Sequence, residues 1–403
     1  MWISLVLFLA LMLGAFSAAP GCNRGRSGVI SDVGGSREMK EDTPGMQPIL
    51  FYVGSSDGKL ESPVFLVELD AGREQFSLKD SFAGARGPSY LVFSPGKDFL
   101  YSIDKTVSDP VTGFMSVASF RIDRQDHGLE FMNRESSQGA GPCHVFCSSD
   151  GEHLFTANYT TGNISVFPIG ELGEILPASC VVQSSGSGPV ERRQGGPHTH
   201  YVTLDPGERH LLSPDLGADK VLVYRFDPEK GTLIPNPQQE YLMLAPGSGP
   251  RHLVFHPSGE FVYVVNELNA TVTACSYDSS SGVLEILNTV PTIPDSRSGP
   301  AYPAAIRMHP GGKYIYASTR GENSSIAVFS TGTDGRINRI QVLDGVPGWP
   351  RDFNIDPSGS YLIAAGERSG EIELYRIEQE TGLLRSTGIK TGITAPACIL
   401  FIQ

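Results

Sequence analysis

The sequence predicts an all-β protein with the architecture of a seven-bladed β-propeller. The first observation is a recurring pattern of glycine or a small residue, proline, a short strand, a Pro-Gly-type turn and a second strand. Its leading prolines stand at positions 88, 142, 197, 250, 303, 350 and 396, which are 54, 55, 53, 53, 47 and 46 residues apart. Seven copies with this period suit propeller blades and not ankyrin or tetratricopeptide repeats. The second observation is the content of 46 glycines and 29 prolines, which supplies many turns.

The copy at residues 249–284 shows how one blade is expected to form. Runs of β-branched and aromatic residues, which favour strands, alternate with turn residues. The expected strands cover residues 253–255, 261–265 and 271–277, and a fourth begins at residue 284. Proline and glycine at positions 257 and 259 mark the first turn. One such sheet cannot bury both of its faces alone, so the repetition is required for a core.

The two ends of the repeat region complement each other. The last copy has a single strand, at residues 398–401, whereas the first copy has three, at residues 49–54, 64–69 and 76–82. Together they make one four-stranded blade, and pairing them removes two exposed sheet edges. The sequence therefore predicts one closed propeller domain over residues 48–403.

The first 47 residues differ in composition from the repeats. Residues 1–21 combine an apolar run with small residues, which is typical of a secretory signal peptide. Cys22 is a candidate for the lipidated cysteine of a bacterial lipoprotein, although Pro20 departs from that motif. Residues 22–47 are rich in glycine, serine and charge and predict a disordered linker. We expect an exported protein, periplasmic or held at a membrane by a lipid anchor; a cytoplasmic location is the alternative.

Charge and cysteine content narrow the class of partner. The chain has 31 Lys and Arg against 44 Asp and Glu, a net charge of −13, which argues against nucleic acid and anionic membranes as partners. Cys143 and Cys147 lie about 13 Å apart in one extended run, too far for a disulfide, so we expect the cysteines of the repeats to be free thiols. His198 and His200 share one strand face, but no carboxylate has a matching position. We expect no metal and no cofactor.

Polar residues gather where the expected strands begin and end. In an antiparallel blade, the start of the first strand and the end of the second lie at the same rim. The strand starts carry His144, His198, His200, Arg251, His252, Arg307 and Arg351, and the strand ends carry Asn158, Asp215, Asn266, Glu267, Arg320 and Glu367. One mouth of the propeller is thus predicted to hold a ligand pocket of histidines, arginines and carboxylates.

These residues also have structural interpretations. Arg251 and Glu267 are adjacent in the expected blade and are alternatively a buried ion pair. Asp215 begins a segment, Asp-Leu-Gly-Ala-Asp, that is typical of an ordered turn. His144 and His252 are alternatively hydrogen-bonded to neighbouring backbone. The sequence alone leaves both interpretations open.

Five motifs resemble those of a known family. They are Gly-Pro-His-Thr-His at 196–200, Asp-Leu-Gly-Ala-Asp at 215–219, Gly-Pro-Arg-His at 249–252, Asn-Glu-Leu at 266–268 and Pro-Arg-Asp-Phe at 350–353. Over residues 48–403 the chain is similar to the seven-bladed propeller lactonases, which include bacterial propeller-type 6-phosphogluconolactonases and fungal carboxy-muconate lactonizing enzymes. The resemblance implies hydrolysis of an anionic sugar δ-lactone; a muconate-type cycloisomerase and a non-catalytic ligand- or protein-binding propeller are the alternatives.

The resemblance also implies roles for individual residues. The site is expected to contain His198 or His200, Arg251, Glu267 and a further arginine, for which Arg320 has the best matching position. Water attacks the ring carbonyl, with Glu267 or His198 as general base and Arg251 holding the oxyanion. Arg320 and Arg351 are expected to hold the substrate's phosphate or carboxylate. The residues expected to contact substrate are His200, His252, Asp215, Asn266, Arg320 and Arg351.

Two departures from the family pattern concern the substrate rather than the fold. Ala304-Ala305-Ile306 stands where many members carry an acidic residue, and Thr319 replaces an asparagine. Export also conflicts with 6-phosphogluconolactone, a cytosolic metabolite, so a lactone found outside the cytoplasm is the alternative substrate. Because Arg251 is placed at the rim, replacing it by alanine is expected to abolish turnover and to leave the fold intact.

Overall fold

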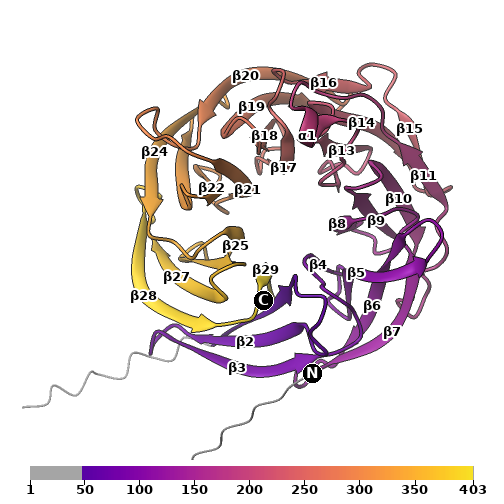
Figure 1. The fold of residues 1–403 in the computed structure, drawn as a ribbon, viewed down its shortest axis with the longest axis horizontal. Coiled ribbons are helices and arrows are strands. Elements are labelled where there is room, and N and C mark those ends of the chain that lie inside the picture. Colours follow the sequence, from indigo (N-terminus) through magenta and orange to yellow (C-terminus); the bar gives the residue numbers. More distant parts are fainter. Residues whose placement is uncertain (1–47, 403) are drawn as a thin grey trace, which may run out of the picture. The chain divides into compact units, whose positions relative to one another are not determined.

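The computed structural model describes residues 48–402, which form seven antiparallel sheets arranged in a ring (Figure 1). We number the sheets as blades 1–7 in chain order, starting with the sheet that contains the first strand. The prediction of an all-β, seven-bladed propeller is confirmed. The predicted signal peptide, the candidate lipidation site at Cys22 and the predicted linker lie outside the described residues.

The first three blades have four strands each. Blade 1 contains β1 (Ile49–Ser55), β2 (Val64–Asp70), β3 (Gln75–Phe82) and, from the other end of the chain, β29 (Pro396–Phe401). Blade 2 contains β4 (Leu91–Phe93), β5 (Phe99–Asp109), β6 (Phe114–Ile122) and β7 (Leu129–Ser136). Blade 3 contains β8 (Pro142–Cys147), β9 (His153–Asn158), β10 (Asn163–Pro168) and β11 (Cys180–Gln183).

Blade 4 differs from the others in its outer strand. It contains β12 (Thr203–Leu204), β13 (His210–Asp215), β14 (Lys220–Asp227), β15 (Thr232–Pro235) and β16 (Tyr241–Met243). Both β15 and β16 pair with β14, so that the expected fourth strand is interrupted between them. Pro235 and Pro237 lie at this interruption and have no N–H group to donate to a strand ladder.

The remaining blades follow the regular pattern. Blade 5 contains β17 (Pro250–Phe255), β18 (Phe261–Asn266), β19 (Thr271–Asp278) and β20 (Val283–Pro291). Blade 6 contains β21 (Ala301–Met308), β22 (Tyr314–Gly321), β23 (Ser325–Thr331) and β24 (Ile337–Asp344). Blade 7 contains β25 (Pro350–Ile355), β26 (Tyr361–Gly366), β27 (Glu371–Ile377) and β28 (Leu384–Gly392). A short helix, α1 (Glu191–Gln194), lies between β11 and β12.

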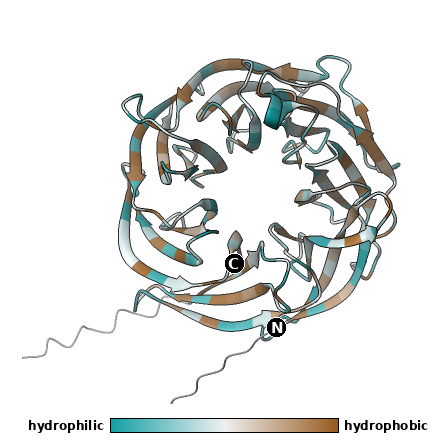
Figure 2. Ribbon diagram, in the orientation of Figure 1, coloured by the Kyte–Doolittle hydropathy of each residue, from teal (hydrophilic) through white to brown (hydrophobic). Residues whose placement is uncertain are grey.

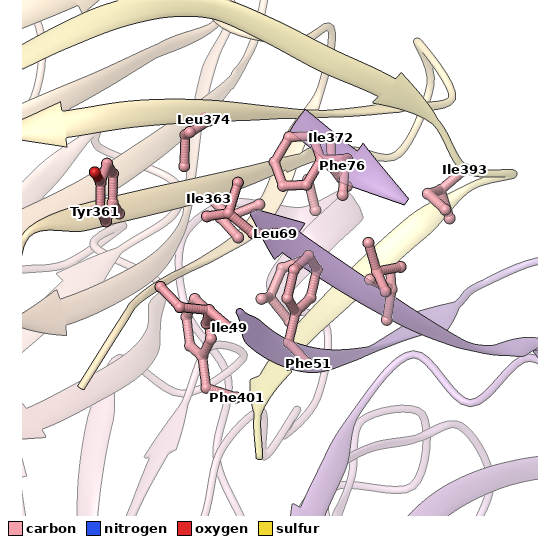
Figure 3. Packing of buried hydrophobic residues seen from close by; sticks show 14 of the residues in the cluster. Ile49, Phe51, Leu69, Phe76, Tyr361, Ile363, Ile372, Leu374, Ile393 and Phe401 are labelled. Atoms are coloured by element: carbon pink, nitrogen blue, oxygen red, sulfur yellow. The ribbon is translucent and has the colours of Figure 1, made fainter. Parts of the chain in front are cut away.

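The ring closes where the two ends of the chain share blade 1. Strand β29 pairs with β1 in antiparallel register, with Phe51 opposite Phe401. The phenylalanine rings at 51, 76 and 401 pack with Ile363 and other residues of blade 7 in one buried cluster (Figure 3). Burial of each such large apolar side chain stabilises the fold by about 1.5–3 kcal/mol. The predicted pairing of the chain ends is confirmed.

The core of the ring lies between neighbouring blades. Hydrophobic and hydrophilic residues alternate along the outer strands (Figure 2), so that each strand has an apolar side and a polar side. The buried clusters cross blade boundaries; Phe155 of β9, for example, packs against Phe226 of β14 with 5.1 Å between ring centroids. A single blade therefore has no complete core of its own, which is why the sequence repeats.

Two histidines outside the predicted pocket join successive blades. The Nε2–H of His256 donates to the carbonyl of Gly312, and the Nε2–H of His309 donates to the carbonyl of Gly359, both over 3.0 Å. In each ring the Nδ1 accepts a backbone N–H of the histidine's own turn. Both turns belong to the rim opposite the Gly-Pro steps. These histidines therefore have a structural role, in which each links its own turn to the turn of the next blade.

Two further findings concern membrane-spanning helices and cysteines. Within residues 48–402 no helix is long and apolar enough to cross a membrane. The five cysteines in this part of the chain are free, namely Cys143, Cys147, Cys180, Cys275 and Cys398. The expected free thiols of the repeats are therefore confirmed.

Candidate functional site

The inner strands of several blades contain a β-bulge just after the Gly-Pro step. The register shifts between Pro142 and His144 in blade 3, between Pro250 and His252 in blade 5, and between Pro350 and Asp352 in blade 7. A bulge leaves one residue unpaired and changes the direction of its side chain. The residues in these bulges are Cys143, Arg251 and Arg351, and each lines a cavity near the ring axis.

A pocket of about 280 Å³ opens at the Gly-Pro rim, and blades 2–7 contribute to it. Four of its side chains are basic, and one is a carboxylate. The charged residues are Lys105 of β5, Arg193 of α1, Glu267 after β18, Arg320 of β22 and Arg351 of β25. The whole chain has a net charge of −13, but these side chains give the pocket a local surplus of positive charge. The pocket is therefore suited to an anionic ligand.

Glu267 lies at the centre of the charged residues and contacts three guanidinium groups. Its Oε1 lies 2.6 Å from Nη2 of Arg193, and its Oε2 lies 2.7 Å from Nη2 of Arg320 and 3.0 Å from Nε of Arg251. The Arg251 contact is an ion pair without an aligned hydrogen bond, since this Nε has no hydrogen-bond partner. The side chains of Glu267 and Arg251 are only 6% and 2% exposed.

The three ion pairs decide the protonation state of Glu267. Burial by itself would raise the pKa of this carboxyl, but Arg320, Arg251 and Arg193 together outweigh burial and hold the pKa well below its usual value. A general base must accept a proton during the reaction, and a carboxylate held by three arginines is a weak acceptor. The geometry therefore argues against the expected role of Glu267 as general base and favours a role in positioning the arginines.

Arg251 is buried rather than exposed at the rim. Its Nη1 donates to the carbonyl of Ala304 over 2.6 Å and lies 3.0 Å from Nε2 of His252. Burial, with Arg320 nearby, lowers the pKa of Arg251 to about 9, which still leaves the group charged at neutral pH. Arg251 and Glu267 do form a buried ion pair, as one of the two interpretations of the sequence expected. The expectation that replacing Arg251 by alanine leaves the fold intact rested on its place at the rim, and the burial of this side chain argues against that expectation.

Arg320 is held by backbone and by an aromatic ring. Its Nε donates to the carbonyl of Tyr302 over 3.1 Å, and its guanidinium lies 5.4 Å from the ring centroid of Trp349. Trp349 itself has a φ of 62°, a left-handed conformation that in blade 5 is taken by Gly249. A bulky residue in this conformation is strained, and such strain persists where the surroundings impose it. Arg351 forms a looser pair, with Nη1 3.6 Å from Oε2 of Glu367.

The structure separates the two histidines of the Gly-Pro-His-Thr-His motif. His200 is 7% exposed and lines the pocket, and its Nδ1 has no hydrogen-bond partner. Burial and the charge of Arg251 lower its pKa well below the usual value, so the ring is neutral at neutral pH. His198 is half-buried and does not line the pocket; its ring stacks on Tyr159 and its Nδ1–H donates to the Tyr159 carbonyl over 2.8 Å. The choice that the sequence left open thus favours His200.

Below the pocket lies a group of rings from the inner strands. His144 and His252 have ring centroids 5.8 Å apart, and His252 lies 5.4 Å from His200. Tyr90 and Tyr201 pack on either side of His144, at 4.0 and 3.8 Å. Burial lowers the pKa values of His144 and His252 well below the usual value. His252, which was expected to contact substrate, lines a narrow cavity next to the pocket and not the pocket itself.

Asp215 and Asn266, which were expected to contact substrate, make their hydrogen bonds within the fold. Oδ1 of Asp215 accepts the backbone N–H groups of His198, Gly217 and Ala218, so the carboxylate orders its own turn and holds the histidine segment. Asn266 is fully buried, and its Nδ2 donates to hydroxyl groups of the next strand, β19. Neither residue lines the pocket.

Arg307 does not join the other arginines at the pocket. Its Nη2 lies 2.8 Å from Oδ1 of Asp352, and both side chains are largely buried. Arg307 lines a separate cavity of about 190 Å³ with residues farther along the inner strands, such as Val254 and Leu400. The expectation that one rim gathers all of the arginines is therefore wrong for Arg307.

Sequence reasoning missed two basic residues of the pocket, Arg193 and Lys105. Arg193 lies in the segment between β11 and β12, whereas the predicted site residues all lie at strand starts and strand ends. The adjacent arginines at 192 and 193, shortly before the histidine motif, were the available signal. Lys105 lies on β5, an inner-blade strand longer than its equivalents, and its Nζ donates to the carbonyl of Ser56 over 2.9 Å.

A larger cavity lies elsewhere. It measures about 590 Å³ and is formed at the opposite rim by turns of blades 2, 3 and 4. Its charged side chains are mainly acidic, namely Asp98, Asp150, Glu152, Glu171 and Glu229 together with Lys230. Because the basic residues, the central carboxylate and His200 converge on the smaller pocket, we take that pocket as the candidate active site. Among residues 48–402 no group of His, Cys, Asp and Glu is arranged to hold a metal ion.

Comparisons with known proteins agree with the fold. Residues 50–401 match the family model described as lactonase, 7-bladed beta-propeller. The chain is 31% identical to the 6-phosphogluconolactonase of Bacillus subtilis, over 89% of this chain and 99% of that protein. The structure of a putative 6-phosphogluconolactonase from Bacteroides fragilis aligns with a TM-score of 0.81 at 31% identity, covering 88% of this chain and 98% of that one. The periplasmic gluconolactonase of Pseudomonas aeruginosa aligns with the same TM-score at 26% identity, covering 88% and 99%.

Proposed function

Because the chain belongs to the seven-bladed β-propeller lactonase family and is a lactonase, we propose that it hydrolyses a sugar δ-lactone in the pocket around Glu267. The observation that carries this proposal is the arrangement of basic side chains around one buried carboxylate, with a neutral imidazole beside them. Ester hydrolysis needs a proton acceptor for water and positive charge near the carbonyl oxygen, and this pocket holds both.

In the proposed mechanism, His200 is the general base. Its Nδ1 has no hydrogen-bond partner, and the neutral ring has a lone pair to accept a proton from water. Burial and Arg251 weaken it as a base, but the nearby carboxylate of Glu267 acts in the opposite direction and stabilises the imidazolium that forms. The water oxygen bonds to the lactone carbonyl carbon, and the negative charge moves to the carbonyl oxygen. The ring C–O bond then breaks, and the leaving alkoxide takes up the proton to give the open-chain hydroxy acid. No covalent enzyme intermediate is involved.

The arginines stabilise the oxyanion in this scheme. Arg320 lines the pocket and reaches the developing charge, while Glu267 holds its guanidinium in place. Arg251 lies beneath, in the narrow cavity, and adds its positive charge from a position with almost no exposure to water. Charge stabilisation at such a dry site contributes about 3–4 kcal/mol per donor in comparable enzymes. Arg251 thus acts mainly through the field in the pocket and through its pairing with Glu267.

The proposed substrate is a gluconolactone, with or without a phosphate group. The Bacillus subtilis relative is named for the phosphorylated lactone, and the Pseudomonas aeruginosa neighbour for gluconolactone itself. The excess of basic side chains in the pocket favours a substrate with an anionic group. Hydrolysis of both compounds, followed with a pH indicator at neutral pH, tests the proposal. Turnover of neither above the spontaneous rate would overturn it and would favour a binding propeller.

Replacing His200 by alanine is expected to lower kcat by about 100-fold or more, the usual contribution of a general base. His198→Ala is the matched control, because this neighbouring histidine does not line the pocket. Its kcat is expected to fall by less than about fivefold. Initial rates of lactone hydrolysis for both variants decide the matter. The opposite ranking would assign the base to His198 and contradict the role given to His200.

We also propose that the protein is exported, on the basis of residues 1–21 and of the periplasmic relative. The mature protein is then expected to lack these residues, and Cys22 is expected to carry lipid if it is the anchor. Intact-mass measurement of protein isolated from periplasm and from membranes tests both points, with Cys22→Ser as the control for lipidation. A chain of full length recovered from the cytoplasm would contradict export.

A further inference from the structure

The short helix α1 is fixed in place by a buried glutamine. Gln194, which has no exposed surface, donates through Nε2 to the carbonyl of Leu216 and to Oδ1 of Asp219, over 2.9 and 2.8 Å. Its Oε1 accepts the backbone N–H of Val190. Asp219 in turn accepts the backbone N–H groups of Gly247 and Gly249 at the start of blade 5. Helix α1 is therefore anchored between blades 4 and 5, next to the pocket.

This anchoring places Arg193 beside Glu267. One nitrogen, Nη2, makes both polar contacts of its guanidinium, at 2.6 Å to Glu267 and at 3.4 Å to the hydroxyl group of Tyr159. Its Nε and Nη1 have no hydrogen-bond partner among the described residues. Arg193 lines the pocket and its side chain is 34% exposed, against 2% for Arg251 and 7% for Arg320. Of the three arginines on Glu267, it has the most donors available to a ligand.

A second basic side chain meets the pocket from another side. Lys105 lies on β5 of blade 2, and its Nζ uses one of three hydrogens on the carbonyl of Ser56. Both residues line the same pocket, and each retains donors that no described residue satisfies. Between blade 2 and α1 the pocket thus presents a guanidinium and an ammonium group, a combination that suits a phosphate or carboxylate better than a neutral hydroxyl group.

We propose that Arg193, assisted by Lys105, is the residue that makes the pocket selective for lactones with an anionic substituent, a phosphate in the first place. The proposal rests on the proposed function in that it takes the same pocket as the substrate site. Glu267 keeps its pairs with Arg251 and Arg320 throughout, so Arg193 is free to turn its unused Nε and Nη1 toward the substrate. Arg193 then contributes to substrate choice and not to the chemical step.

Binding of the open-chain products tests this selectivity without requiring turnover. The probes are 6-phosphogluconate and gluconate, titrated calorimetrically into the full-length protein. Arg193→Met is expected to weaken binding of 6-phosphogluconate by about 10- to 100-fold, the range for loss of a charge-assisted hydrogen bond, and to change gluconate binding by less than about threefold. Arg192→Met removes the same charge from the neighbouring exposed position and is expected to change neither ligand by more than about twofold.

Arg193→Lys separates charge from geometry. It is expected to restore part of the lost affinity, because an ammonium group keeps the charge but cannot form the two-pronged contact. Thermal unfolding of each variant checks that the fold is kept. An equal loss for both probes would overturn the proposal, since Arg193 would then act only by supporting Glu267. Equal affinity of the unchanged protein for the two probes would overturn it too.

The two proposals fail in different ways. Selective binding that depends on Arg193, without hydrolysis of either lactone, would contradict the proposed function. It would support the proposed role of Arg193 in binding the anionic group. Hydrolysis of both lactones with the same kcat/KM, unchanged in Arg193→Met, would support the proposed function and overturn the selectivity. The ratio of kcat/KM values for phosphorylated and neutral lactone in the two proteins supplies this second measurement.

Discussion

Replacing Glu267 by glutamine is expected to destabilise the protein by about 3–5 kcal/mol, the usual effect of removing one partner of a buried ion pair. The glutamine keeps the size of the side chain and removes only its charge. Arg251 and Arg320, which are 2% and 7% exposed, then remain buried beside each other without a counter-charge. For a propeller of this length the loss corresponds to a fall in Tm of about 4–7 °C. Thermal unfolding followed by circular dichroism measures it.

The same change is expected to lower kcat by about 100-fold or more. Without the carboxylate, the guanidinium groups of Arg320 and Arg251 repel each other and leave the positions that stabilise the oxyanion. Glu367→Gln is the matched control, because its pair with Arg351 is longer, 3.6 Å, and more exposed. We expect it to change stability by less than about 1 kcal/mol. Equal effects of the two substitutions would show that the buried cluster has no special importance.

Stability is expected to fall as the pH drops below about 6.5, because three buried histidines are neutral in the folded protein. Burial is the main cause that lowers the pKa values of His144, His200 and His252 well below 6.5. In this window the unfolded chain binds protons that the folded protein does not, so unfolding becomes easier as pH falls. Each histidine contributes up to about 1.4 kcal/mol at one pH unit below its usual pKa, or about 4 kcal/mol together.

Chemical denaturation at pH 7.5 and at pH 5.5 measures this difference. His144→Gln removes one of the three buried imidazoles and is expected to reduce the difference between the two pH values by about one third. The carboxylate of Glu267 does not affect this comparison of the two pH values. Its pKa is lowered in the folded protein, so its contribution to the free energy of unfolding decreases only below about pH 4.5. A free energy of unfolding that stays constant between the two pH values would contradict neutral histidines in the folded state.

The architecture followed from the sequence because it depends on local signals. Each Gly-Pro step and each Pro-Gly turn marks a strand boundary by itself, and their period gives the number of blades. The single strand of the last copy and the three strands of the first add up to one four-stranded blade, so the pairing of β29 with β1 was predictable. The rim that holds the candidate pocket was also predictable, since strand direction alone places strand starts and strand ends together.

The chemistry within that rim was decided by tertiary structure. Glu267 or His198 was expected to be the general base, and the three arginines around Glu267, one of them 74 residues away on α1, argue against that role for Glu267. Arg251 was expected at the rim, with a catalytic role and a buried ion pair both left open, and the structure buries it beside Glu267. Sequence spacing specifies which strand end a residue occupies, but protonation and burial depend on the charges and atoms that other blades bring within a few ångströms. For the same reason, only the folded ring separates His200 in the pocket from His198 beside it.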